Sequence, residues 1–213
     1  MKVVLIGASG ATGKSLVEVI LEDTKVQELV VLVRKPVFSP QMRLREIVVD
    51  FDDLDHYREE IKGDVAISCL GTTLKQAGSK EDQWKVDFDY QYHFSQIAKE
   101  NGVPKMILLS SKGANSHSHI FYSKMKGCLE DKIRDLSFDS FIMVRPSLLV
   151  RPNTDRAGEK LAEKVLRFFN SIGWFKAYRP LTVRKVAKVI YHKAQKSSEK
   201  IEILELRDME HID

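Results

Sequence analysis

The amino-terminal stretch restricts the fold of this chain more than any other. A short apolar run from Lys2 to Ile6 passes directly into a glycine loop, and apolar residues then recur at helical spacing through Ile20. The pattern predicts a buried strand, a glycine loop and a helix. The loop reads Gly7-Ala8-Ser9-Gly10-Ala11-Thr12-Gly13. Its three glycines allow a sharp turn off the strand, a close approach of bare backbone to a ligand, and close packing of the helix on the sheet.

The unpaired N–H groups at the start of such a helix attract phosphate groups, so the loop predicts a dinucleotide site. The predicted contacts are Gly7, Ser9, Gly10, Ala11, Thr12 and Gly13. Shifted by one residue, the stretch from Ala8 to Ser15 approximates the P-loop of nucleotide triphosphatases, although that motif needs glycine in place of Ala8. An ordinary tight turn between strand and helix is the other alternative. The position of the loop between a strand and a helix favours the dinucleotide.

Composition is typical of one soluble α/β domain. The 213 residues carry a net charge of +4, which is too small and dispersed to indicate a nucleic-acid partner. The early apolar run is too short for a leader and no stretch approaches a membrane span, so we expect a cytoplasmic protein. His117 and His119 lack a third ligand, so no metal site is predicted. We expect residues 1–213 to form a single domain in which about 145–213 contribute the substrate side.

Buried strands are predicted at several further places along the chain, alternating with helices. The strands are expected at 28–33, 46–49, 65–73, 106–111, 140–144 and 201–205, the last at a sheet edge, and the helices at about 83–100, from Phe121 onward, at 159–170 and at about 180–190. This alternation predicts a Rossmann-type, doubly wound, mostly parallel sheet flanked by helices. His93, on the helix expected at about 83–100, is interpreted as a packed or hydrogen-bonded residue.

The end of the second strand indicates which dinucleotide is bound. An acid about 20 residues after the glycine loop selects NAD, whereas an arginine accommodates a 2′-phosphate. Arg34 stands there with Lys35 beside it, which predicts NADP, with NAD as the less favoured choice. Solvated charge at a strand end is the alternative. Asp50 follows the third strand and is a candidate partner of the adenine amino group, while Asp53 or Asp55 is expected to cap the next helix.

The ends of two central strands supply further candidates. Gly71 would let backbone pass beside the cofactor, and Thr72 offers a hydroxyl to its ribose or phosphates. Ser110 and Ser111 stand at the carboxyl end of another strand, and ligands of open parallel sheets bind outside those ends.

Tyr122 and Lys126 are four residues apart on a predicted helix and therefore share one face. A nearby ammonium stabilises a phenolate, which makes Tyr122 a better proton donor to a carbonyl oxygen while hydride arrives from the cofactor. A hydroxyl from Ser111 would hold that oxygen, and Lys126 would also bond the nicotinamide ribose.

These motifs together resemble the short-chain dehydrogenase/reductase superfamily, in particular its atypical NAD(P)-binding members such as the Tat-interactive oxidoreductase-like proteins. The resemblance rests on the glycine loop, Cys69-Leu70-Gly71-Thr72, Leu109-Ser110-Ser111-Lys112-Gly113-Ala114, Tyr122 with Lys126, and Val144-Arg145-Pro146-Ser147. It implies that Ser111, Tyr122 and Lys126 are catalytic, with Ser110 a substitute for Ser111. It also implies that Cys69, Leu70 and Pro146 lie against the cofactor.

The leading hypothesis is an NADP-dependent oxidoreductase that acts on a small carbonyl or alcohol substrate, as a monomer or homodimer. One alternative is a dinucleotide-binding sensor or interaction protein without turnover, because several atypical members of the superfamily have lost catalysis and 213 residues leave little room for a substrate lobe. A third is an epimerase that oxidises its substrate transiently with a cofactor that never leaves.

Overall fold

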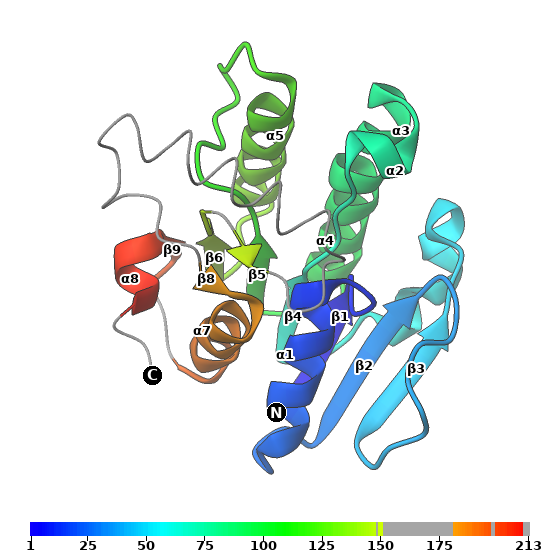
Figure 1. Ribbon diagram of the computed structural model, residues 1–213. Coiled ribbons are helices and arrows are strands. Elements are labelled where there is room, and N and C mark those ends of the chain that lie inside the picture. Colours follow the sequence, from blue (N-terminus) through cyan, green and yellow to red (C-terminus); the bar gives the residue numbers. More distant parts are fainter. Residues whose placement is uncertain (148, 151–180, 197–198, 211–213) are drawn as a thin grey trace.

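A single parallel sheet organises the computed structural model, which describes residues 1–147, 149–150, 181–196 and 199–210. Seven strands lie in the order β3-β2-β1-β4-β5-β6-β9, and every neighbouring pair is parallel (Figure 1). The strands are β1 (Lys2–Ile6), β2 (Glu28–Val33), β3 (Leu44–Val48), β4 (Val65–Ser68), β5 (Lys105–Leu109), β6 (Ser140–Val144) and β9 (Ile201–Leu204). The chain order reverses between β1 and β4, which confirms the predicted Rossmann-type sheet.

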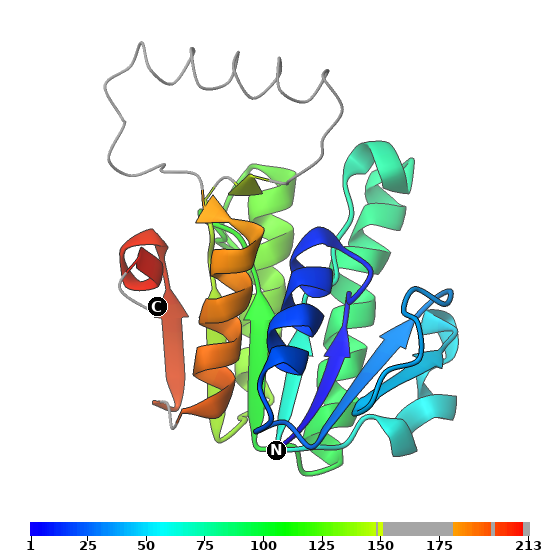
Figure 2. The ribbon, with the colours of Figure 1, turned by 60° about the horizontal axis from the view of Figure 1, so that its bottom comes forward.

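Helices cover both faces of the sheet (Figure 2). Helices α1 (Ala11–Glu22) and α7 (Val183–Gln195) pack together on one face. The 3₁₀ helix η1 (Phe51–Glu60), α4 (Tyr90–Glu100) and α5 (Phe121–Asp135) cover the other. Alternate residues of the buried strands supply the two cores, as the two-residue period of a strand requires. Val3 and Leu5 face α1 and α7, for example, whereas Val4 and Ile6 face the opposite layer.

The shorter elements lie beside this framework. They are α2 (Leu74–Ala77), α3 (Lys80–Trp84), the π-helix η2 (Lys85–Asp89), the two-stranded parallel pair β7 (Leu149–Val150) and β8 (Leu181–Thr182), and α8 (Leu206–Glu210). The expected helix over about 83–100 is therefore α4 preceded by a π-helical turn and a separate short helix. The helix expected at 159–170 lies outside the described residues.

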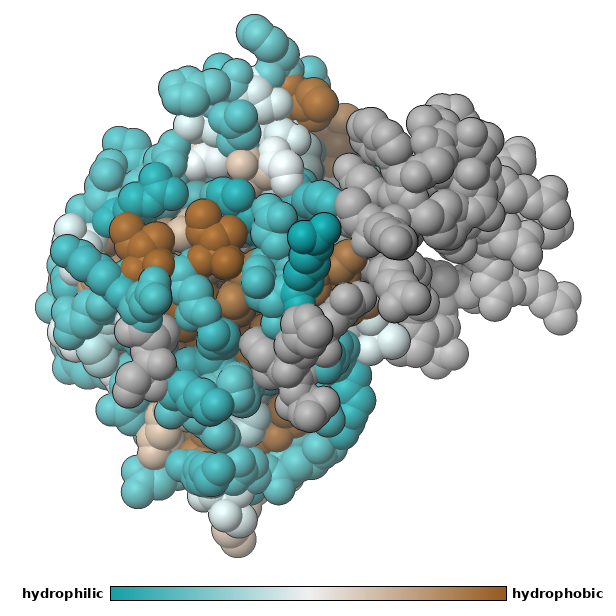
Figure 3. All heavy atoms as spheres, turned by 90° about the vertical axis from the view of Figure 1, so that its left-hand side faces the viewer, coloured by the Kyte–Doolittle hydropathy of each residue, from teal (hydrophilic) through white to brown (hydrophobic). Residues whose placement is uncertain are grey.

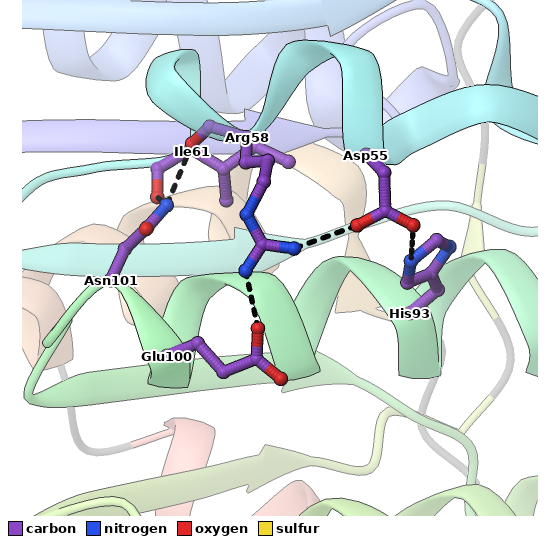
Figure 4. A network of polar contacts seen from close by, with 6 residues as sticks. All are labelled: Asp55, Arg58, Ile61, His93, Glu100 and Asn101. Carbon is purple, nitrogen blue, oxygen red and sulfur yellow. Dashed lines mark hydrogen bonds and ion pairs between the residues drawn. The ribbon is translucent and has the colours of Figure 1, made fainter.

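The cap of η1 differs from the prediction. Asp50, rather than Asp53 or Asp55, accepts from the N–H of Asp52 at 2.9 Å, because the helix begins at Phe51. Asp55 instead bonds Arg58 at 2.7 Å and His93 Nε2 at 3.2 Å, and Arg58 also reaches Glu100 (Figure 4). These contacts tie η1 to α4, and they agree with the interpretation of His93 as a packed or hydrogen-bonded residue.

Strand β9 forms one edge of the sheet, as expected. Ile201 and Ile203 are both 41% exposed there, whereas Leu204 is buried. The face on this side of the molecule is mostly hydrophilic where it is coloured, and apolar residues reach its surface in small patches (Figure 3). Among the described residues, no helix has the length and apolar character needed to cross a membrane.

Candidate functional site

The glycine loop joins β1 to α1, and its three glycines are required for different reasons. Gly7 has a φ of +80°, and a Cβ there would lie 2.3 Å from the carbonyl carbon of Cys69. A Cβ on Gly13 would lie 2.1 Å from the carbonyl oxygen of Gly7. On Gly10 the nearest atom would be 3.4 Å away, which is ordinary contact. The protein itself therefore excludes side chains at two of these positions, whereas the space above Gly10 is open.

The start of α1 is suited to an anion. Gly10 is its N-cap and has no side chain that could cap it, so the first N–H groups of the helix have no side-chain acceptor among the described residues. No acidic residue lies in the first turn. An uncapped helix N-terminus next to open glycine backbone favours a phosphate group.

Two cavities adjoin at this loop, each of about 550 Å³. Both are lined by Gly10 and Ala11 and by the segment 69–72 that follows β4. The first extends toward the end of β2 and adds Gly7, Ser9, Val33, Arg34, Phe51 and Tyr90. The second extends toward β5 and α5 and adds Thr12, Ser110, Tyr122, Lys126 and Pro146. Most of the predicted site residues thus lie along one cleft at the carboxyl ends of the strands.

The cavity at the end of β2 has the features expected of an adenosine site. Arg34 is exposed and lines it, and Phe51 and Tyr90 supply aromatic surface, their ring centroids 5.4 Å apart. Lys35 is also exposed but does not line the cavity. Asp50 lines a smaller adjoining hollow that it shares with Arg34. The predicted contacts of Lys35 and Asp50 with cofactor stay predictions.

Lys126 lies in the second cavity with its side chain only 2% exposed, and its Nζ is 3.1 Å from Oδ1 of Asp87. Asp87 is 1% exposed and its Oδ2 accepts from the N–H of Thr72 at 2.7 Å. An ammonium buried to this degree requires a counter-charge. Tyr122, one helical turn earlier on α5, is 39% exposed and lines the same cavity.

The two serines after β5 have different surroundings. Ser110 lines the cavity and is buried, and its Oγ has no hydrogen-bond partner among the described residues. Ser111 does not line it, and its Oγ donates to the carbonyl of Lys112 at 3.3 Å. A buried hydroxyl without a partner costs free energy, so the geometry favours Ser110 as the serine that meets a ligand.

Cys69 contributes backbone and bulk to this cleft rather than a reactive thiol. It lines both cavities, and burial raises the pKa of its thiol to about 12. The thiolate is the reactive form of cysteine, so we expect Cys69 to be inert near neutral pH.

Two structural features beside the cavities were not predicted from the sequence. One is Asp87, which stands with Gln91, Phe94 and Ala98 at the spacing of a buried helix face. A carboxylate and an amide within such a face are a signal of a buried polar network. The other is the ion pair between Arg145, at the end of β6, and Glu130 of α5.

The Glu130–Arg145 pair stands directly before Pro146, which lines the second cavity. Arg145 Nε donates to Glu130 Oε1 at 3.0 Å, and its Nη2 donates to Glu130 Oε2. These two hydrogen bonds raise the pKa of Arg145. Glu130 is 1% exposed. Because Glu130→Gln removes a buried charge-assisted partner, we expect it to lower the free energy of unfolding by about 2 kcal/mol, as measured by urea denaturation. Asp131→Asn is the control, since its pair with Arg134 is exposed, and we expect a change within about 0.5 kcal/mol. An equal loss of unfolding free energy in both variants would contradict the conclusion that the buried pair stabilises the protein more than the exposed one.

Together the parallel sheet, the glycine loop and the cleft at the switch in strand order define a dinucleotide-binding protein of the Rossmann type. Comparison with known proteins specifies the family. A model of the NAD(P)H-binding family matches residues 7–167, and the chain belongs to that family. The family ligand agrees with the dinucleotide interpretation of the glycine loop rather than with a P-loop.

Relatives and solved structures extend this result. The chain is 33% identical to the rat protein HTATIP2 over 99% of its own length and 88% of that protein. It is 30% identical to the mitochondrial protein FMP52 of Candida albicans, over 92% of this chain and 89% of that protein. The Bordetella bronchiseptica enzyme WbmH, solved in complex with NAD+, superposes with a TM-score of 0.73 at 14% identity, covering 96% of this chain and 75% of that one. The name of the Candida relative places that protein in mitochondria, and a cytoplasmic location for this chain stays a prediction.

Proposed function

We propose that the protein is an NADP-dependent oxidoreductase of the short-chain dehydrogenase/reductase type, acting on a small carbonyl or alcohol substrate. The observation that carries the proposal is that Tyr122, Lys126 and Ser110 line one cavity beside the glycine loop, and that the Ser110 hydroxyl has no partner in the part of the chain that the structure describes. A proton donor, a cation and a free hydroxyl in one cleft are the groups that carbonyl reduction needs from a protein.

The site residues fit a nicotinamide dinucleotide. The open space above Gly10 and the uncapped start of α1 suit the pyrophosphate, and Arg34 suits a 2′-phosphate. Ser110, Tyr122, Lys126 and Pro146 line the side on which the nicotinamide would lie. When bound, the cofactor supplies or accepts the hydride.

In the proposed reduction, Ser110 donates a hydrogen bond to the carbonyl oxygen and holds it toward Tyr122. Tyr122 gives its phenolic proton to that oxygen as the carbon receives hydride, so the products are an alcohol and a phenolate. Lys126, one turn away on α5, stabilises the phenolate by its charge. In the oxidation direction the phenolate takes the alcohol proton, and the same groups act in reverse order.

Calorimetric titration of purified, cofactor-stripped protein with NADPH, NADH and ATP tests the proposal before any substrate is known. We expect NADPH to bind at least about tenfold more tightly than NADH, with no binding of ATP. A panel of small aldehydes and ketones then follows, with NADPH absorbance as the readout. Binding of ATP alone would overturn the proposal, and NADPH binding without turnover of any compound would favour a sensor.

Arg34→Glu tests the adenosine end. The carboxylate would repel a 2′-phosphate and accept hydrogen bonds from the hydroxyl of NADH, so we expect the preference for NADPH over NADH to fall by about thirtyfold. Arg207→Glu, the same charge change at an exposed position of α8, is the control and should leave the preference unchanged. If both variants keep the parental preference, Arg34 does not contact the adenosine end.

A further inference from the structure

The buried ion pair of Asp87 and Lys126 is a neutral unit in the wall of the second cavity. Both side chains line that cavity, and both are at most 2% exposed. The other charged side chain that lines it, among the described residues, is the exposed Lys80. Water screens an exposed charge strongly and a buried one weakly. The balance between Asp87 and Lys126 therefore dominates the electrostatic potential inside the cavity.

Asp87 is held rigidly by its surroundings. Its Oδ2 accepts from the N–H of Thr72 at 2.7 Å, and its carbonyl oxygen accepts from Nε2 of Gln91, also at 2.7 Å. The side-chain oxygen of Gln91 in turn accepts from the hydroxyl of Ser68 at 2.7 Å. The residue lies in the π-helical turn η2, a local geometry often found at functional sites.

The carboxylate also lies against the segment that both cavities share. A Cβ built on Gly71 would be 3.3 Å from Oδ1 of Asp87, so the backbone after β4 passes close to the charge. Asp87 thus connects three parts of the site: the lysine of α5, the backbone N–H of Thr72 and the glycine beside it. A carboxylate used only for folding would not need to face a ligand cavity, yet this one lines it.

We propose that Asp87 is a positioning residue whose negative charge balances Lys126, and that this balance sets the relative affinity for oxidised and reduced cofactor. The inference rests on the proposed function, because it requires the nicotinamide to lie in this cavity. Oxidised nicotinamide carries a positive charge on the ring, whereas reduced nicotinamide is neutral. An unbalanced buried cation disfavours the oxidised form, and an unbalanced buried anion favours it. The neutral pair lets both forms bind, as reversible hydride transfer requires.

A charge cycle on the full chain tests the inference without measuring turnover. Asp87→Asn keeps an acceptor for the N–H of Thr72 and leaves Lys126 unbalanced, Lys126→Met leaves Asp87 unbalanced, and the double variant removes both charges. Calorimetric titration with NADP+ and with NADPH gives the ratio of the two dissociation constants for each protein. We expect the NADP+/NADPH ratio to rise about tenfold in Asp87→Asn, to fall about tenfold in Lys126→Met and to return within about threefold in the double variant.

The ratio separates this role from a structural one, because loosening the site weakens both cofactor forms alike. Equal loss of affinity for both forms in the two single variants, with an unchanged ratio, would overturn the inference. If Asp87→Asn does not fold, Asp87→Glu replaces it, since the charge is kept and the ratio should stay within about threefold of the parent. A tenfold change there would equally overturn the inference. Failure of the unmodified protein to bind either form would instead refute the proposed function.

Discussion

Tyr122→Phe is expected to lower turnover about 10³-fold on any carbonyl compound found by screening, because it removes only the hydroxyl that donates the proton. Tyr122 lines the second cavity and is 39% exposed, and phenylalanine keeps the same ring there. We therefore expect the dissociation constant of NADPH, measured by calorimetry, to change by less than about threefold. The loss should appear in kcat rather than in KM.

Tyr92→Phe is the matched control. Tyr92 is a half-buried residue of α4 that packs near Phe88 and lines neither cavity, so its hydroxyl has no role in the proposed reaction. We expect its turnover to stay within about twofold of the parent protein. Full turnover by Tyr122→Phe would remove this tyrosine as proton donor. A parallel loss of turnover in both variants would show that the first result is not specific.

The sheet was predictable from the sequence because its strands are buried on both faces. Runs such as 28–33 and 140–144 are almost wholly apolar, which is typical of a parallel sheet covered by helices on two sides. The glycine loop then placed the first turn, and the alternation of strands with helices left few other topologies. The prediction was weaker for η2, because a π-helical turn arises from one extra residue in a helix and leaves no distinct periodicity.

The candidate site was predictable only in part. Parallel strands end at one edge, so the residues after β1, β4 and β5 were expected to meet there. The sequence favoured Ser111 as the catalytic serine, with Ser110 as a substitute, whereas Ser110 is the one that lines the cavity. Successive side chains point in opposite directions, so the end of the strand is needed to say which serine faces the cleft. Asp87 was missed because a single acid in an amphipathic helix is usually solvated. Its place on the buried face with Gln91 is the local signal, but the ion pair with Lys126 of α5 that balances its charge is a contact between distant parts of the chain.

Substitution of the glycines should separate binding from folding. Gly10 has φ −75° and ψ 167°, which alanine adopts freely, and its Cβ would meet no atom closer than 3.4 Å. We expect Gly10→Ala to keep the stability of the parent within about 0.5 kcal/mol and to weaken NADPH binding by about thirtyfold, because the methyl group would occupy the space over which the pyrophosphate lies. Urea denaturation and calorimetric titration measure the two effects.

Gly13→Ala, unlike Gly10→Ala, should lower the stability of the fold. Its Cβ would lie 2.1 Å from the carbonyl oxygen of Gly7 and 2.8 Å from the Cα of Ala8, and both are backbone atoms that cannot rotate away. We expect the free energy of unfolding to fall by about 3 kcal/mol, since the start of α1 must move off β1 to relieve the overlap. If Gly10→Ala were instead the unstable variant, or if it bound NADPH as tightly as the parent, the phosphate site would not lie over this loop. Loss of binding in Gly10→Ala with retained stability requires a ligand at that position, because no atom of the described residues would lie closer than 3.4 Å to the added methyl group.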